Sequence, residues 1–333
     1  MTAITPGYSS PSHLTPGKSW GMRRLADASG RFRMLAIDQR PPIMDMIRTR
    51  TGAAPRFGQT AEVKRLLAET LAPSASAVLV DPVWGYDACA AHLRADRGLI
   101  LTLEDHAFAD GPGGRRSAWI EGWTPQRIRR AGGDAVKLLA WLRPDADPVV
   151  TAHQLAVVAA TGEACRTEDI PFVCELLLYP FASTAGIGTD YASDPARRPE
   201  MVRESVAALV APTYGVDLWK LESPLPPEHV PDPDGPEAAP VQALFDELGK
   251  TVRGPWVMLS GGADLARFLR VLTYAYRAGA SGFLAGRTIW AAAFAGYPDL
   301  AAVRAALAGP SCAALDRLNE LTERLARPWQ TCP

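Results

Sequence analysis

The sequence predicts a single (β/α)8 TIM barrel with extra terminal helices, because three observations agree on it. Eight short apolar runs recur along the 333 residues, helical patterns separate them, and no break in composition divides the chain. Continuous apolar runs are typical of parallel strands that are buried on both faces. An open doubly wound sheet is the alternative, but the glycine-rich stretch 111–114 contains Pro112 and follows no strand-to-helix turn, unlike a phosphate-binding fingerprint.

The predicted strands coincide with the apolar runs, and most of these runs contain or precede a polar residue. In chain order they are residues 33–37, 77–80, 99–103, 135–140, 172–178, 216–221, 256–259 and 283–285. The polar residues stand at or near the ends of the runs, so we expect them to gather at one end of the barrel.

Apolar residues at three-to-four spacing predict the helices between the strands. Thr60 is the expected N-cap of the first, and Asp147 with Pro148 opens another that extends to residue 161. Further helices are expected over residues 199–209 and 265–276, with closing helices over 303–307 and 315–325.

Three irregular segments are expected. Residues 1–20 are rich in Ser, Thr, Pro and Gly and predict a flexible tail, so that the barrel with its C-terminal helices occupies residues 21–333. Residues 111–114 and 230–239 predict loops after the third and sixth strands. We expect both loops at the carboxyl-terminal rim, where barrel enzymes place their chemistry.

Composition excludes several function classes. The net charge of −1 provides no global field for binding nucleic acid or an anionic membrane, although local cations are compatible with a small anionic substrate. No apolar run is long enough to span a membrane, and the N-terminus lacks the apolar stretch of a signal peptide. The five Cys are scattered without a CxxC or zinc spacing, which favours a reducing cytoplasm.

Five charged residues lie within or directly after the predicted strands: Asp38, Lys137, Glu175, Lys220 and Arg287. A charge inside a buried parallel strand is costly unless it is paired or used. One interpretation is a set of buried ion pairs that stiffen the barrel, but such pairs contribute little net stability. The other interpretation is an active site.

Two lysines and a carboxyl group support a definite chemistry. A lysine among apolar side chains, with a second ammonium nearby, loses its proton more easily and can attack a carbonyl to form a Schiff base. The iminium then accepts electrons from a breaking carbon–carbon bond while the carboxyl group moves protons. Backbone N–H groups of Ser260, Gly261 and Gly286 together with Arg287 would bind a phosphate. This set indicates an aldolase that needs no metal and no cofactor beyond the lysine.

Six motifs strengthen this interpretation. They are MLAIDQR (34–40), DAVKLL (134–139), FVCE (172–175), DLWKLE (217–222), PWVMLSG (255–261) and SGFLAGRTIW (281–290). In this order they resemble the tagatose 1,6-bisphosphate aldolase family of class I aldolases, which includes sulfofructose phosphate aldolases. The resemblance covers roughly residues 24–310.

The resemblance implies roles for matching positions. Lys220 matches the Schiff-base lysine, Glu175 the proton-transfer acid, and Lys137 a lysine that contacts substrate and sets the electrostatics. Asp38 is counted with the catalytic residues and, like Gln39, matches a residue that binds substrate hydroxyls.

The remaining matches concern substrate binding. Arg40 belongs to the first motif, and Ser260, Gly261, Gly286 and Arg287 match the anion-binding end. The stretch 260–263 reads SGGA where the family usually has SAGV or SSGV, a departure at this end. Tyr179, which follows Glu175, resembles the sugar bisphosphate members of the family more than the sulfo-sugar members.

The expected reaction is cleavage of tagatose 1,6-bisphosphate or a similar ketose phosphate into dihydroxyacetone phosphate and glyceraldehyde 3-phosphate. The alternatives are cleavage of 6-deoxy-6-sulfofructose 1-phosphate to sulfolactaldehyde, or a non-catalytic regulator that binds a sugar phosphate. The presence of both Lys220 and Glu175 favours an enzyme. Glu104, Asp105 and His106 could hold a cation, but no second strand-end His supports a metal site. We expect a homo-oligomer.

Overall fold

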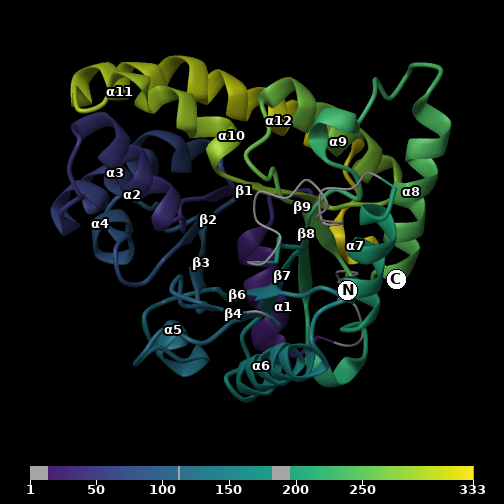
Figure 1. Cartoon of the computed structure of the whole chain (residues 1–333). Coiled ribbons are helices and arrows are strands. Elements are labelled where there is room, and N and C mark those ends of the chain that lie inside the picture. Colours follow the sequence, from purple (N-terminus) through teal and green to yellow (C-terminus); the bar gives the residue numbers. More distant parts are fainter. Residues whose placement is uncertain (1–13, 112, 182–195, 333) are drawn as a thin grey trace, which may run out of the picture.

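The computed structural model describes residues 14–111, 113–181 and 196–332 and contains a closed barrel of eight parallel strands, so the predicted fold is confirmed (Figure 1). Around the barrel the strands follow the order β1-β10-β9-β8-β7-β6-β3-β2. Their bounds are β1 (Phe32–Ala36), β2 (Ala77–Val80), β3 (Gly98–Thr102), β6 (Ala135–Trp141), β7 (Phe172–Leu177), β8 (Leu218–Leu221), β9 (Trp256–Met258) and β10 (Gly282–Ala285).

The helices surround the strands in chain order (Figure 1). They are α1 (Pro16–Leu25), α2 (Pro41–Thr51), α3 (Phe57–Leu71), α4 (Tyr86–Ala90), α5 (Pro125–Arg130), α6 (Pro148–Thr167), α7 (Arg198–Ala207), α8 (Ala238–Thr251), α9 (Leu265–Arg277), α10 (Arg287–Trp290), α11 (Leu300–Ala306) and α12 (Cys312–Leu325). Short turns of 3-10 or π helix join some of them: η1 (Ala72–Ser74), η3 (Pro212–Tyr214), η4 (Pro227–His229), η5 (Ala291–Gly296), η6 (Leu307–Ser311) and η7 (Trp329–Thr331).

Local chemistry sets several helix starts. The Asp147 side chain accepts a hydrogen bond from the Val149 N–H at the start of α6, as predicted, and Asp264 does the same for Arg267 at the start of α9. Thr60 is not an N-cap, because α3 begins at Phe57 and Thr60 is buried within it.

Two apolar clusters make up the core. The larger cluster lies between the strands and the surrounding helices. The smaller cluster fills the amino-terminal part of the barrel interior with inward-facing residues such as Met34, Ile100 and Val173, and Met22 of α1 and Trp329 join it. Because this end is filled by apolar side chains, only the carboxyl-terminal end is left for a polar site.

The predicted division at residue 20 is wrong, because α1 crosses it. Lys18, within the predicted tail, is buried, and its Nζ lies 2.7 Å from Oδ2 of Asp217 at the amino end of β8. The composition of residues 16–25 gave little indication of a helix, because contacts with the barrel, such as that of Lys18 with Asp217, stabilise α1. Residues 1–13, the rest of the predicted tail, lie outside the described residues.

The two predicted loops also differ from expectation. Gly111 and Gly114 pair with each other in an antiparallel hairpin of β4 (Ala109–Gly111) and β5 (Gly114–Arg116), and Pro112 lies outside the described residues. The loop 230–239 does not stay at the carboxyl-terminal rim. Its Asp232 carbonyl accepts a hydrogen bond from the Tyr274 hydroxyl, and its Asp234 pairs with Arg277, both near the C-terminal end of α9. This loop therefore runs along the outside of the barrel.

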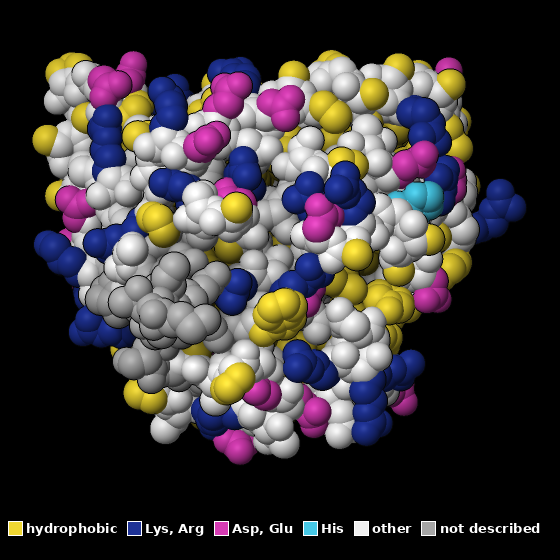
Figure 2. Space-filling view, turned by 180° about the vertical axis from the view of Figure 1, so that it is seen from behind, with side chains coloured by type: hydrophobic (Ala, Val, Ile, Leu, Met, Phe, Trp, Pro, Cys, Tyr) yellow, Lys and Arg dark blue, Asp and Glu magenta, His cyan; other side chains and the backbone are white. Residues whose placement is uncertain are grey.

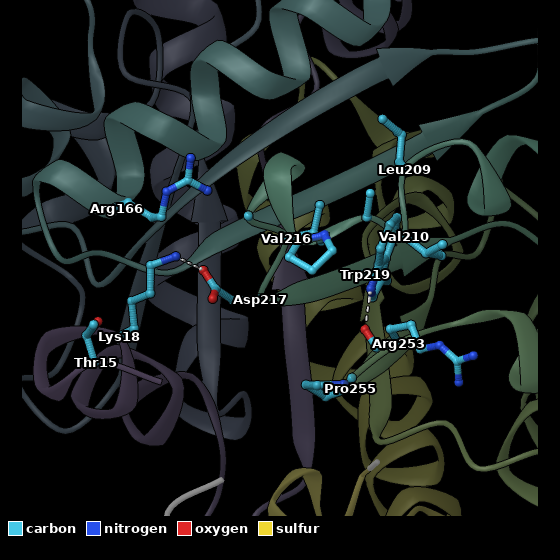
Figure 3. A pocket seen from close by; sticks show the side chains of 14 residues that line it. Thr15, Lys18, Arg166, Leu209, Val210, Val216, Asp217, Trp219, Arg253 and Pro255 are labelled. Carbon is cyan, nitrogen blue, oxygen red and sulfur yellow. Dashed lines mark hydrogen bonds and ion pairs between the residues drawn. The ribbon is translucent and has the colours of Figure 1, made fainter. Parts of the chain in front are cut away.

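A cavity of about 500 Å³ lies beside the amino ends of β8 and β9 (Figure 3). The Lys18–Asp217 pair lies in its wall, and Trp219 Nε1 donates to the Arg253 carbonyl oxygen at 2.9 Å. This cavity opens at the end of the strands opposite to the predicted site.

Basic and acidic side chains are interspersed over the face opposite to that of Figure 1, with no field of one sign (Figure 2). Among the described residues, none of the helices is both long and apolar enough to cross a membrane.

Candidate active site

The strand register brings the predicted charged residues together inside the carboxyl-terminal half of the barrel. Glu175 of β7 lies directly beside Lys220 of β8, and Leu139 of β6 lies on its other side. Lys137 is two residues before Leu139 and therefore points to the same face, one layer deeper. Parallel strands in this register place three charged side chains on the barrel interior.

Lys137 is the centre of a buried charge cluster. Its Nζ lies 2.6 Å from Glu175 Oε2, 2.9 Å from Glu104 Oε1 and 3.1 Å from Asp38 Oδ2. Within the described part of the chain, Lys220 has a single carboxylate partner, Glu175, whose Oε1 lies 2.8 Å from its Nζ. Glu175 thus bridges the two lysines.

Burial and charge act in opposite directions on the pKa values of this cluster. Burial alone would lower the pKa of Lys137, but Asp38, Glu104 and Glu175 outweigh it and raise that pKa well above its usual range. Burial likewise raises the pKa of Asp38, but Lys137, Lys220 and Arg40 hold it well below its usual range. Lys137 therefore stays an ammonium ion and Asp38 a carboxylate at neutral pH.

Glu104, which the sequence analysis considered as a cation ligand together with Asp105 and His106, is a member of this cluster. Its pKa is lowered, since Lys137 and Arg40 outweigh the effect of burial. Arg40, predicted to bind substrate, donates from Nη2 to Glu104 Oε1 at 3.0 Å and from Nη1 to the Glu104 carbonyl oxygen at 2.8 Å. The place of Glu104 just after an apolar run was the available signal, as it was for Asp38.

The cluster forms the floor of a cavity of about 300 Å³. All four predicted catalytic residues line it, with Gln39, Arg40 and Arg287 from the predicted substrate-binding set. Aromatic residues form part of its wall: Phe108 and Trp141, with ring centroids 5.1 Å apart.

A second cavity of about 310 Å³ adjoins the first, because Leu177 and Arg287 line both. Ser260 and Gly261 face this second cavity. Gly261 has a φ of 59°, in the left-handed region that favours glycine. Ser260 and Gly261 therefore lie beside the lysine cluster, and the exposed Arg287 lies between the two cavities.

Gly286 places Arg287 by allowing close backbone contact. A Cβ at residue 286 would lie 2.4 Å from the Ala36 carbonyl oxygen and 3.0 Å from Gln39 Nε2. Gly286 itself does not line either cavity, so its role in the structure is to let β10 turn sharply beside β1.

Glu222 was not predicted as a site residue, although it lines the second cavity two residues after Lys220. It forms an ion pair with Arg198 of α7 and accepts a hydrogen bond from the Leu178 N–H at 2.6 Å. Burial raises the pKa of Glu222 despite these contacts. Glu222 is part of the DLWKLE motif. The sequence indicated which way its side chain points only through the alternation of side chains along a strand, which places residues 220 and 222 on the same face.

Glu175 Oε2 accepts no hydrogen bond but lies 2.6 Å from Lys137 Nζ. Among the described residues that line the cavity, two further buried acceptor atoms have neither a hydrogen-bond partner nor an ion-pair partner: Asp38 Oδ1 and Gln39 Oε1. An unsatisfied buried acceptor is costly. A ligand that brings hydroxyl groups into this cavity would satisfy both atoms.

The described residues contain no group of three or more His, Cys, Asp and Glu that could hold a metal ion. Glu104, Asp105 and His106 were considered in the sequence analysis as ligands of a cation. In the structure Glu104 instead forms ion pairs with Lys137 and Arg40, and His106 Nδ1 lies 3.3 Å from Asp105 Oδ1. Burial lowers the pKa of His106.

Fold and site together define a barrel enzyme with a lysine–carboxylate cluster at the carboxyl ends of its strands. Residues 32–292 match the family model described as "DeoC/LacD family aldolase". The chain belongs to this family of aldolases.

Two curated relatives match the chain over nearly their full length. The tagatose 1,6-diphosphate aldolase 1 of Streptococcus mutans is 30% identical over 95% of this chain and 99% of its own length. A tagatose 1,6-diphosphate aldolase 2 of Streptococcus pyogenes is 31% identical over 95% and 98%.

Solved structures share the fold at low sequence identity. A fructose-bisphosphate aldolase from Plasmodium falciparum has a TM-score of 0.67 and 14% identity, covering 96% of this chain and 98% of its own. A Schiff-base-forming fructose-1,6-bisphosphate aldolase has a TM-score of 0.58 and 16% identity, covering 91% and 98%.

Proposed function

We propose that the protein is a class I aldolase that cleaves a ketose 1,6-bisphosphate, tagatose 1,6-bisphosphate in particular, into dihydroxyacetone phosphate and glyceraldehyde 3-phosphate. The observation that carries the proposal is the contact of Lys220 with Glu175 at 2.8 Å on the floor of a cavity. Two relatives named as tagatose 1,6-diphosphate aldolases support the choice of sugar.

The first half of the reaction forms the Schiff base. Lys220 passes a proton from Nζ to Glu175 Oε1, and the free amine attacks the C2 carbonyl of the sugar. A proton moves from the attacking nitrogen to the former carbonyl oxygen to give a carbinolamine, and loss of water leaves the iminium. Glu175 supplies the proton for the departing water and is left as a carboxylate.

The second half breaks the carbon chain. Glu175 takes the proton of the C4 hydroxyl, the C3–C4 bond breaks, and its electron pair moves into the iminium to give an enamine. The aldehyde leaves, Glu175 returns its proton to C3 of the enamine, and the addition of water to the resulting iminium releases dihydroxyacetone phosphate and the Lys220 ammonium group. Lys137, held as an ammonium ion by three carboxylates, supplies a fixed positive charge throughout.

Substrate binding follows from the two adjoining cavities. The phosphate next to the carbonyl carbon enters the second cavity, against Ser260, Gly261 and Arg287. The sugar hydroxyls lie in the first cavity and donate to the unsatisfied oxygens of Asp38 and Gln39.

The lysine, rather than a metal ion, supplies the electron sink in this proposal, so we propose that no metal or other cofactor is needed. A cytoplasmic location and a homo-oligomeric state stay predictions. Sulfofructose phosphate cleavage and a purely regulatory role stand as alternatives, but the Lys220–Glu175 contact favours catalysis over regulation.

A substrate panel tests the function. We expect tagatose 1,6-bisphosphate to release dihydroxyacetone phosphate, measured by coupled oxidation of NADH, with unchanged rates in EDTA. 6-Deoxy-6-sulfofructose 1-phosphate should be a much poorer substrate. Cleavage of the sulfo-sugar alone would establish the first alternative, and tight binding of every ketose phosphate without cleavage would establish the regulator.

A further inference from the structure

Glu104 is held on three sides. Oε1 accepts from Lys137 Nζ at 2.9 Å and from Arg40 Nη2 at 3.0 Å, and Oε2 accepts from the Leu139 N–H at 3.0 Å. Its backbone carbonyl oxygen also accepts from Arg40. The carboxylate is buried, so it cannot swing toward a substrate without losing several of these bonds.

Lys137 has three ammonium hydrogens and three carboxylate neighbours, Glu175, Glu104 and Asp38. Its hydrogen bonds go to Glu104 Oε1, to Asp38 Oδ2 and, at 3.5 Å, to Thr102 Oγ1, while Glu175 Oε2 lies 2.6 Å away as an ion-pair partner. Glu104 is the neighbour that is itself fixed by a main-chain N–H group and an arginine. It consequently sets where the ammonium group lies relative to Glu175.

The charges around the cluster balance. The three cations are Lys137, Lys220 and Arg40, and the three carboxylates are Asp38, Glu104 and Glu175. Of the other titratable or charged groups among the described residues, Asp105, His106 and Arg287 line the first cavity. The second cavity adds Arg198, Glu222 and Glu228. Without Glu104 the cluster would carry an excess positive charge beside Glu175.

We propose that Glu104 is a positioning residue for the cleavage reaction: it fixes the ammonium group of Lys137 and offsets its charge beside Glu175, the group that accepts protons from Lys220 and from the substrate. This inference rests on the proposed function. The proton moves from Lys220 Nζ to Glu175 Oε1, so the net charge of the cluster does not change in that step.

The proposal predicts a pH effect with a definite sign. Removal of a nearby negative charge makes each neighbouring group release its proton at lower pH. In Glu104→Gln, free amine would therefore form at lower pH, whereas Glu175 would become a weaker base. The acid limb of Schiff-base formation should move down by about 1 pH unit. The kcat for cleavage should nevertheless fall by ~10–100-fold.

The experiment separates these two effects. Dihydroxyacetone phosphate is trapped on the full-length protein with cyanoborohydride across a pH series, and the labelled fraction is read by mass spectrometry. The kcat for cleavage is measured on untreated aliquots of the same protein preparations. Glu69→Gln, which removes a surface carboxylate of α3, is the matched control and should change neither quantity.

Arg40→Gln provides a second variant that leaves the Glu104 carboxylate in place. It removes a positive charge, so the acid limb should move to higher pH, opposite to the shift in Glu104→Gln. A lower kcat with the limb unmoved in both variants, or shifts of the same sign, would overturn the proposal. Failure of the wild-type protein to trap any product would instead contradict the proposed function.

Discussion

Two buried ion pairs at the carboxyl end of the barrel differ in what surrounds them. Lys220 and Glu175 meet at the floor of a cavity, and Glu175 shares its second oxygen with Lys137. Lys64 of α3 and Asp81, which follows β2, are wholly buried together.

The second pair satisfies its own hydrogen-bonding groups. Lys64 Nζ also donates to the Ile37 carbonyl oxygen at 2.7 Å, and Asp81 Oδ1 accepts from the Trp84 N–H at 2.7 Å. Both pairs carry the same sequence signal, a carboxylate in or after an apolar run. From this difference we infer that a strand-end charge indicates chemistry where the structure leaves a cavity in front of it.

Replacing the lysine of each ion pair with methionine compares the two pairs directly, and the larger loss of activity is expected at Lys220. Lys220→Met should lower kcat by ~10⁴-fold or more, because no amine remains to form the iminium. Its stability should change little, since Glu175 keeps Lys137 as a partner. Steady-state kinetics and thermal unfolding measure the two quantities. Substantial residual cleavage would mean that another lysine is the nucleophile.

Glu175→Gln keeps the size of the side chain but cannot exchange protons. We expect kcat to fall by ~10²–10⁴-fold while KM changes little, because Arg287 and its cavity still hold the phosphate. If turnover stays near that of the wild type, Asp38 becomes the candidate proton carrier.

Lys64→Met is the counterpart of Lys220→Met at the cavity-free pair. It leaves Asp81 as an unpaired buried charge, so we expect the free energy of unfolding to fall by ~3–5 kcal/mol. The kcat of the folded enzyme should be retained. Urea denaturation gives the first quantity, and a loss of kcat without a loss of stability would remove the distinction between the two pairs.

Arg287→Ala should affect binding more than chemistry. Charge-assisted hydrogen bonds to the phosphate are lost, so KM should rise by ~10–100-fold with a smaller change in kcat. Inorganic phosphate should inhibit the wild type and inhibit this variant less. Equal losses in kcat for this variant and for Glu175→Gln would show that binding and chemistry are not separated as proposed.

The smallest expected effect is a pH dependence of stability. Asp38 and Glu104 have lowered pKa values, so their contribution is fully present above their ordinary values of 3.8 and 4.5 and is lost as pH falls further. Lys137 has a raised pKa, so its contribution is present below 10.5 and is lost at higher pH. The thermal unfolding midpoint should thus decline on both sides of this window. In Asp38→Asn the acid decline should be shallower.

The barrel was predictable because parallel strands buried on both faces are continuous apolar runs. Helices with strong caps, such as α6 after Asp147, were also predictable. Helix α1 and the β4–β5 hairpin were not, because tertiary contacts stabilise these short elements: Lys18 with Asp217, and the Tyr179 hydroxyl, which accepts from the Arg115 N–H at 3.1 Å.

That charged residues gather at one end of the barrel could be predicted from the sequence, but the contacts between them could not. The sequence placed Lys137, Glu175 and Lys220 on separate strands, whereas the register that lets Glu175 bridge the lysines is a property of the closed sheet. Glu104 and Asp81 carry equivalent sequence signals, yet one joins the cluster and the other is buried beneath α3.

The central claim is that Lys220 is the nucleophile and Lys137 is not. Within residues 14–111, 113–181 and 196–332, Lys220 has one carboxylate partner and Lys137 has three. Borohydride reduction in the presence of dihydroxyacetone phosphate, followed by peptide mass mapping, tests it most directly. We predict a stoichiometric mass increase on the peptide that contains Lys220, together with loss of activity. A label on Lys137, or inactivation without a label on either lysine, would contradict the account.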